Sequence, residues 1–336
     1  MTVRKNPFVI LLALSVICLV ISRADDSRHA KKEEITVSGP GVLWREPSDL
    51  ASRDLIYGTG GEAHRPRPPF RFEKEDMEGS NPKFTVVDGA GVKWKVKLGL
   101  EARPETAASR LVWAVGFFTP EDYLLKDLTV SNLPITLQRG MKRRDPDGTM
   151  HNVRLKREAK DEKKLGNWKW DDPALAGREL DGLRVLMAVL NNWDLKDINN
   201  AVYEQAGERI LMVTDLGASF GSGNRSFPGT KAKDNLAEYT RSRFIIRRNG
   251  DAVDFFNPSR PRFVYAVVPS EYFMRVHMQT LGRNIPREHA VWMGKQLAQL
   301  SPKQIRDAFR CAGYSPDEVE QFAQTLEKRI AQLTDL

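Results

Sequence analysis

The stretch Val92–Leu98, VKWKVKL, alternates four apolar residues with three lysines, and this pattern most restricts what the chain can form. Successive side chains of a strand point to opposite faces, so the alternation predicts a strand with one apolar and one basic face. FRFEK (Phe70–Lys74) and FTVVD (Phe84–Asp88) are also strand-like, and the DGAG that follows is typical of a hairpin turn. We therefore expect an antiparallel meander that begins at Phe70.

A helix and a further strand are predicted next. Pro104–Phe117, PETAASRLVWAVGF, begins with Pro and Glu and places apolar residues on one side, as helices do. Tyr123–Val130, YLLKDLTV, can add a strand to the meander. Arg139–Lys164 then carries ten Lys or Arg against five Asp or Glu. We interpret this run as a solvated loop or helix face, with a phosphate-facing patch as the alternative.

The second half of the chain favours helices around one hairpin. Leu180–Trp193 has the apolar density of a buried helix, and NAVYE and RILMVTD flank the turn QAGE as hairpin strands do. The last 50 residues are predicted to be helical. Ser301 and Ser315 each precede a proline, a pairing typical of an N-cap followed by the first helical residue.

The N-terminus has the pattern of an export signal. Arg4 and Lys5 precede the apolar run Phe8–Ile21, and Ser22–Ala24 offers small residues for cleavage. We expect export to a periplasmic, extracellular or secretory compartment, with an uncleaved membrane anchor as the alternative. Membrane contact is expected only through residues 8–21, and only if the signal is uncleaved. Residues 25–69, rich in Gly, Pro and charge, are interpreted as a linker or an extended lead-in.

The composition indicates a globular protein. With 41% hydrophobic and 29% charged residues in 336, the chain suits one large or two modest globular domains. A net charge of +8 is compatible with phosphate-bearing partners, but no nucleic acid is predicted as a partner. The five histidines lack the spacing of zinc ligands. Cleavage of the signal would remove Cys18 and leave Cys311, which we interpret as a packed residue, without an intrachain partner.

Two polar segments carry the chemistry. WDLKDINN (Trp193–Asn200) places Asp194 five residues before Asn199, and ILMVTDLG (Ile210–Gly217) ends an apolar strand on Asp215. Carboxylate and amide oxygens suit Mg²⁺, which completes its shell with water and substrate phosphates. If the predicted hairpin returns Asp215 to the loop, these three side chains form one wall of a metal and phosphate site. Turn capping is the plainer interpretation of each segment alone.

The order of these motifs resembles that of protein kinases. DLKDIN resembles the kinase catalytic loop, and DLG resembles the Asp-Phe-Gly element. WKVK ends a third strand as the ATP-binding lysine strand does, which makes Lys97 the candidate. Glu105, early in the next helix, resembles the ion-pair partner of that lysine, with Glu101 as its competitor. DMEGSNPK (Asp76–Lys83) would be the turn that covers the phosphates, through Gly79, Ser80 and Lys83.

The resemblance implies a bilobal α+β fold with an antiparallel N-terminal sheet plus one helix at 70–138 and a mainly helical lobe at 139–336. It implies that Lys97 holds the phosphates of ATP, that Glu105 orients Lys97, and that Asp194 positions or deprotonates an acceptor hydroxyl. Asn199 and Asp215 would bind Mg²⁺. The acceptor, whether protein, lipid or small molecule, is left open.

The chain departs from conventional kinases at several points. The phosphate turn lacks Gly-x-Gly-x-x-Gly, Trp193 stands in place of Arg, Leu216 stands in place of Phe, and no Ala-Pro-Glu follows Asp215. These departures make the chain more similar to divergent kinases: phosphoinositide kinases, HipA-type kinases, and the secretory-pathway and spore-coat kinases.

Two other functions compete with phosphotransfer. One is a catalytically inactive, kinase-like binding module of the cell envelope. The other is a serine hydrolase, because GASFG (Gly217–Gly221) matches Gly-x-Ser-x-Gly, with Ser219 as nucleophile and Asp251 or Asp254 and His277 or His289 downstream. The glycine-rich sequence after Ser219 does not favour the helix that this motif requires. Ser219→Ala would abolish a hydrolase, whereas Asp215→Ala would abolish a kinase.

Overall fold

The computed structural model describes residues 35–37, 39–77, 81–134, 137–158, 163–221, 233–257 and 269–336. The expected export signal in residues 1–24 lies outside the described residues, and so do Gly79 and Ser80 of the expected phosphate turn. Within the described ranges, no helix has both the length and the apolar character needed to cross a membrane.

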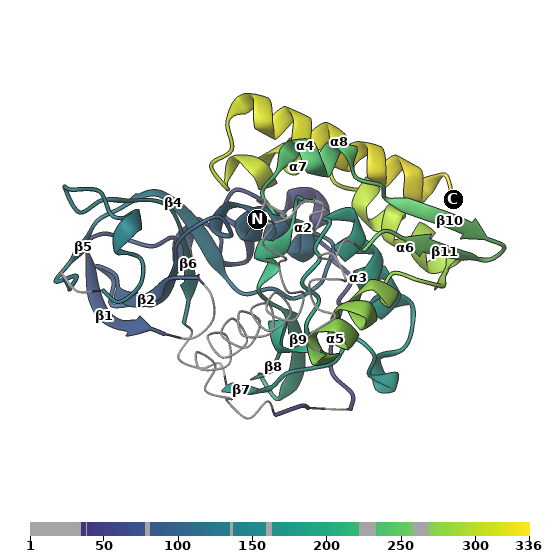
Figure 1. The fold of residues 1–336 in the computed structure, drawn as a ribbon, viewed down its shortest axis with the longest axis horizontal. Helices are drawn as coiled ribbons and strands as arrows, with labels where there is room; N and C mark the ends of the chain where they lie inside the picture. Colours follow the sequence, from purple (N-terminus) through teal and green to yellow (C-terminus); the bar gives the residue numbers. More distant parts are fainter. Residues whose placement is uncertain are drawn as a thin grey trace, which may run out of the picture.

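A six-stranded sheet forms one end of the molecule (Figure 1). Its strands are β1 (Phe70–Asp76), β2 (Lys83–Val87), β3 (Lys93–Lys97), β4 (Asp122–Leu128), β5 (Val130–Ser131) and β6 (Met150–Arg157). The spatial order is β4-β6-β3-β2-β1-β5, and β1, β2 and β3 pair antiparallel in sequence. The predicted meander and the added strand near Tyr123 are both confirmed.

The strand β6 lies between β3 and the edge strand β4, inside the sheet. The sheet therefore extends past residue 138, where we expected the N-terminal lobe to end. The run interpreted as a solvated loop or helix face supplies one of its internal strands. Val153 and Leu155 are fully buried in it, whereas the charged residues around them dominate the sequence pattern. The surrounding charged residues obscure the short apolar alternation of this strand in the sequence.

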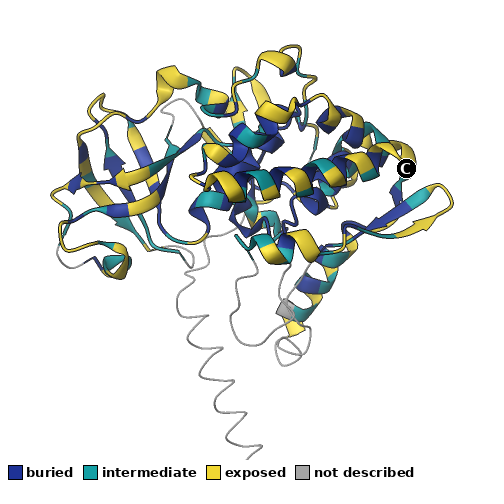
Figure 2. Ribbon diagram, turned by 90° about the horizontal axis from the view of Figure 1, so that it is seen from above, coloured by how far each residue is buried: buried dark blue, intermediate teal, exposed yellow. Residues whose placement is uncertain are grey.

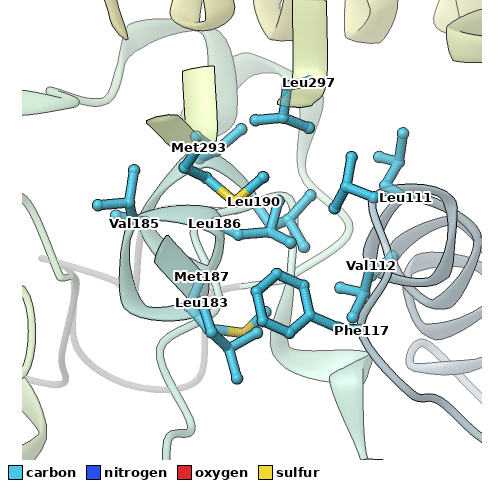
Figure 3. Packing of buried hydrophobic residues seen from close by; sticks show 14 of the residues in the cluster. Leu111, Val112, Phe117, Leu183, Val185, Leu186, Met187, Leu190, Met293 and Leu297 are labelled. Atoms are coloured by element: carbon cyan, nitrogen blue, oxygen red, sulfur yellow. The ribbon is translucent and has the colours of Figure 1, made fainter. Parts of the chain in front are cut away.

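The helix α2 (Ala102–Ala114) lies between the sheet and the helical part of the chain (Figure 1). Its apolar side chains belong to the large core shared with α3 (Arg178–Val189) and α6 (Arg287–Ala298), while the sheet has a separate core. Figure 3 shows Leu111 and Val112 of α2 on one side of the large core, opposite Leu186 and Leu190. Packing in the helical part therefore fixes the position of α2.

The helical part also contains two small sheets. Its other helices are α4 (Leu236–Arg241), α5 (Pro269–Thr280), α7 (Pro302–Arg310) and α8 (Pro316–Thr334). One sheet pairs β7 (Lys163–Gly166), β8 (Asn200–Gln205) and β9 (Glu208–Val213), and the other pairs β10 (Ile245–Asn249), β11 (Ala252–Phe255) and β12 (Ile285–Pro286). The helices expose one face and bury the other (Figure 2). The predicted bilobal α+β class, with an antiparallel N-terminal sheet, one helix and a mainly helical remainder, is confirmed.

Short 3₁₀ helices and helix caps complete the framework. The 3₁₀ helices are η1 (Leu50–Ser52), η2 (Gly58–Gly60), η3 (Glu62–His64), η4 (Met141–Arg143), η5 (Pro173–Leu175), η6 (Asp197–Asn199) and η7 (Leu216–Ala218). Ser301 and Ser315 cap α7 and α8, each in a reciprocal capping box that satisfies two free N–H groups of the helix start. Both predicted N-caps are confirmed.

Residues 39–69 pack against both parts of the molecule. The backbone N–H of Arg45 donates to the Gly116 carbonyl just after α2, and Val42 forms a β-bridge with Ile210 on β9. The Gln304 side chain of α7 donates to the carbonyl of Leu50 at 2.8 Å. This lead-in, which we expected to be a linker or an extended segment, is therefore a strap that packs against the end of α2, β9 and α7.

Candidate active site

The ammonium of Lys97, at the end of β3, is the centre of a buried ionic cluster. Its Nζ lies 2.8 Å from Oε2 of Glu105, 2.9 Å from Oε2 of Glu101 and 2.5 Å from Oδ1 of Asp215. The Lys97 side chain is only 4% exposed. Burial by itself would lower the pKa of Lys97, but the three carboxylates hold this pKa well above its ordinary value. Lys97 is therefore a fixed positive charge.

Lys97 differs from the two lysines that precede it on β3. Lys93 and Lys95 are exposed, as strand alternation predicts for that face, whereas Lys97 on the same face is buried. The start of α2 and the 3₁₀ turn η7 supply the carboxylates that surround the end of the strand. The sequence pattern alone cannot distinguish the three lysines, because the difference comes from what covers them.

Glu105 and Glu101 both contact Lys97, so the structure brings together both candidates for its acidic partner. Glu105 lies in the first turn of α2, and its second oxygen accepts from Nη2 of Arg154 on β6 at 2.7 Å. Glu101 precedes α2, and its second oxygen forms an ion pair with Lys233. Sequence reasoning missed Arg154 and Lys233, which no motif marks.

Asp215 lies two residues after the end of β9, directly after Thr214. Its backbone is left-handed, with φ at 55° and ψ at 50°, a conformation that turns its side chain toward Lys97 at a torsional cost. Burial raises the pKa of the Asp215 carboxyl, but the Lys97 ammonium outweighs it and holds the pKa well below its ordinary value. The side chain is 41% exposed, so this ionised carboxylate keeps access to solvent.

The hairpin returns Asp215 to the polar loop as predicted. Asn200 pairs with Val213 in the β8–β9 register. One residue further, the backbone N–H of Thr214 donates to the Asn199 carbonyl at 3.0 Å and its hydroxyl donates to the same carbonyl at 2.7 Å. Asn199 and Asp215 are thus held on adjacent ends of one hairpin.

Asp194 begins the polar loop and is held on two sides. The Asn199 amide Nδ2 donates to the Asp194 carbonyl at 2.7 Å, which closes the loop. Nη1 of Arg275 on α5 donates to Oδ1 of Asp194 at 3.2 Å, and Nζ of Lys196 lies 3.4 Å from the same oxygen. The Arg275 guanidinium also lies over the ring of Trp193. Arg275 was missed by sequence reasoning, because it lies 81 residues from Asp194.

Lys83 is the one proposed nucleotide-binding residue of the phosphate turn that the structure describes. Lys83 begins β2, and its backbone lies opposite that of Lys97 in the antiparallel pairing of β2 and β3. Its charge also contributes to the lowered pKa of Asp215. Lys83 therefore adds positive charge at the edge of the ionic cluster.

The oxygen donors of this site fit Mg²⁺. The Asp215 carboxylate is ionised and partly exposed, and the Asn199 amide uses its nitrogen on Asp194 and so retains its oxygen as an acceptor. In the described part of the chain, no three His, Cys, Asp or Glu side chains form a metal site by themselves. A bound Mg²⁺ would thus take its other ligands from water and phosphate.

The structure does not assemble the competing hydrolase site. Ser219 is fully buried, and its hydroxyl donates to the Leu216 carbonyl at 2.8 Å within the η7 turn. Asp254 pairs with Arg247 and Arg283, and His289 lies 2.9 Å from Asp181. The serine has none of these acids or bases beside it and no exposed position for attack.

The chain was compared with protein families, curated proteins and solved structures. No protein-family model matches the chain, and no curated protein matches it. Among solved structures, the chain is similar to the crystal structure of a Helicobacter pylori proinflammatory kinase, CtkA. The TM-score is 0.42 and the sequence identity is 10%, over 79% of this chain and 94% of the bacterial chain. The kinase activity in that name belongs to the bacterial protein.

Proposed function

We propose that this protein is a Mg²⁺-dependent phosphotransferase that uses ATP, with its site around Lys97. One observation carries the proposal: a buried lysine is shared by a helix carboxylate, Glu105, and by the partly exposed Asp215 that follows the hairpin. A fixed cation beside an ionised, solvent-accessible carboxylate suits a phosphate chain and its metal ion. The loop of Asp194 and Asn199 lies against the same hairpin.

Each residue has a role that follows from its contacts. Lys97 supplies a positive charge to the nucleotide phosphates, and Glu105, held by Arg154, orients that charge. Asp215 and Asn199 are the residues that would hold Mg²⁺, with Lys83 at the edge of the site. The metal, when bound, neutralises charge on the phosphates.

Asp194 is the residue that would receive the acceptor. Arg275 and Lys196 occupy its Oδ1, which leaves Oδ2, 3.4 Å from the Asn199 amide nitrogen, for the hydroxyl of an acceptor. The carboxylate orients the hydroxyl and takes its proton as the oxygen attacks the terminal phosphorus of ATP. The bond to the departing nucleoside diphosphate then breaks. The acceptor class is open, and export of the protein is a separate part of the proposal.

Thermal-shift titration with ATP and GTP, each with and without Mg²⁺, tests the nucleotide site. We expect stabilisation of the wild type that requires Mg²⁺ and that Asp215→Asn abolishes. Asp127→Asn, which alters an exposed carboxylate on β4 that pairs with His151, serves as the control and should retain the shift. A wild type that shows no Mg²⁺-dependent shift with either nucleotide would exclude the proposed site.

Phosphotransfer itself needs a second measurement. Release of ADP with a panel of protein, lipid and small-molecule acceptors should depend on Asp194, so Asp194→Asn should retain the nucleotide shift and lose turnover. Nucleotide binding without turnover on any acceptor would instead support the inactive binding module.

A further inference from the structure

Glu101 contacts four segments that are distant from one another in the sequence. Its Oε2 lies 2.9 Å from Nζ of Lys97 on β3 and accepts from the side chain of Asn81 just before β2. Its Oε1 pairs with Lys233, 132 residues later. Its stem lies against Gly217, where an added Cβ would come within 2.6 Å of Cβ of Glu101. The Glu101 side chain therefore links β3 and the start of β2 to Gly217 and Lys233.

Glu101 and Glu105 have parallel contacts with different consequences. Each shares one carboxylate oxygen with Lys97 and gives the other to a second cation. For Glu105 that cation is Arg154, which belongs to the sheet as Lys97 does. For Glu101 it is Lys233, which belongs to the helical part of the chain. Of the two glutamates, Glu101 is therefore the one whose second ion pair links the sheet to the helical part.

The charge balance around Lys97 makes this second carboxylate consequential. Three carboxylates share one ammonium, and Asp215 is the most exposed of the three. A divalent cation that engages Asp215 would weaken its attraction for Lys97. Glu101 and Glu105 would then hold the ammonium, and Lys233 would fix the position of Glu101.

We propose that Glu101 is a second positioning residue for Lys97, and that its ion pair with Lys233 ties the lysine to the helical part when nucleotide binds. This role rests on the proposed function, because it concerns how Lys97 is held for phosphate binding. Lys233 thereby contributes to nucleotide affinity without contacting the nucleotide.

A double-mutant cycle tests the ion pair without any ligand. The variants are Glu101→Gln, Lys233→Met and the double variant, measured by thermal unfolding. Lys233→Met should lower Tm by about 3 °C in the wild type and by far less in the Glu101→Gln background. Lys303→Met, which removes an exposed lysine paired with Asp307, is the control and should lower Tm equally in both backgrounds. Additive effects of Glu101→Gln and Lys233→Met would overturn the ion pair.

Nucleotide affinity tests the positioning role. Both Glu101→Gln and Lys233→Met should raise the Kd for Mg²⁺-ATP about tenfold. Lys303→Met should leave this Kd unchanged. A merely structural role would lower Tm and leave Kd unchanged, and that result would overturn the proposal. A wild type that binds no Mg²⁺-nucleotide, together with a non-additive cycle, would instead reject the proposed function and retain the ion pair.

Discussion

Asp215 lies 2.5 Å from the Lys97 ammonium, although 118 positions separate the two residues in the sequence. The same ammonium contacts Glu105 and Glu101, so the four side chains form one electrostatic unit. Within such a unit the loss of the single cation has a larger effect than the loss of any one anion, because it leaves several carboxylates close together.

Lys97→Met should therefore destabilise the protein as well as remove phosphate binding. Removal of one partner from a buried ion pair costs about 3 to 5 kcal/mol, and here three carboxylates lose their shared partner. Urea unfolding measures the change. Lys93→Met, which removes a half-exposed lysine of the same strand, should cost less than about 1 kcal/mol. Equal stability of the two variants would contradict the cluster.

The pH dependence of stability should report the Asp215 carboxyl. Its pKa is lower in the folded protein than the ordinary value of 3.8, since the Lys97 charge outweighs burial. A lowered pKa contributes stability that is present above the unfolded-state value and lost as pH falls below it. The Tm difference between wild type and Asp215→Asn should be constant from about pH 5 to 8 and shrink below about pH 4. A difference that does not shrink between about pH 4 and pH 2 would show that it is not electrostatic.

Gly217→Ala should disturb the site through contact with Glu101. An added Cβ would lie 2.6 Å from Cβ and 2.9 Å from Cγ of Glu101, atoms near the backbone that cannot swing away. Overpacking of this kind costs about 1 to 3 kcal/mol, so unfolding should shift and the Mg²⁺-ATP response should weaken. Gly61→Ala meets no neighbouring atom, although its positive φ adds some strain, and should leave the nucleotide response unchanged.

Arg329→Met should destabilise the helical part. The guanidinium is buried and donates to five acceptors around the end of α3 and α4. These acceptors are the carbonyls of Ala188, Val189 and Tyr239, Oδ1 of Asn191 and Oγ of Ser242. Loss of these five buried hydrogen bonds should cost about 3 kcal/mol by urea unfolding. Lys328→Met, at the exposed neighbouring position, is the matched control, and a similar cost for both variants would refute this role.

Cys311 should be unreactive in the native protein. Burial, with the nearby Asp122 and Asp307, raises the pKa of its thiol to about 12, and Sγ donates to the Ala308 carbonyl. Iodoacetamide reacts with the thiolate, so at pH 8 a Cys18→Ser protein should be labelled only after unfolding in urea. Rapid labelling of the folded chain would show that the thiol is accessible.

Much of the framework could be predicted from local sequence patterns. Alternation in Val92–Leu98 and the turn beside it determine the meander, and the hairpin that ends at Val213 follows from its strand residues and central glycine. The N-caps Ser301 and Ser315 are also local signals. Each of these features depends on neighbours within a few residues, which is why the sequence indicates them.

The remaining features depend on distant partners. Lys97 is buried because α2 and η7 cover the end of its strand, and Arg275 reaches Asp194 from 81 positions away. β6 was missed because charge masks its short apolar alternation. The ion pairs of Arg154 and Lys233 likewise form only once the chain has folded. No local pattern carries such contacts.

The strap of residues 39–69 has a consequence for the order of events on the ribosome. The Leu50 carbonyl receives its hydrogen bond from Gln304, a residue synthesised 254 positions later. At translation rates of about 5 to 20 residues per second, this partner follows about 13 to 50 s after Leu50. The strap thus leaves the ribosome well before α7, and the Leu50 carbonyl waits for this partner until α7 has been made.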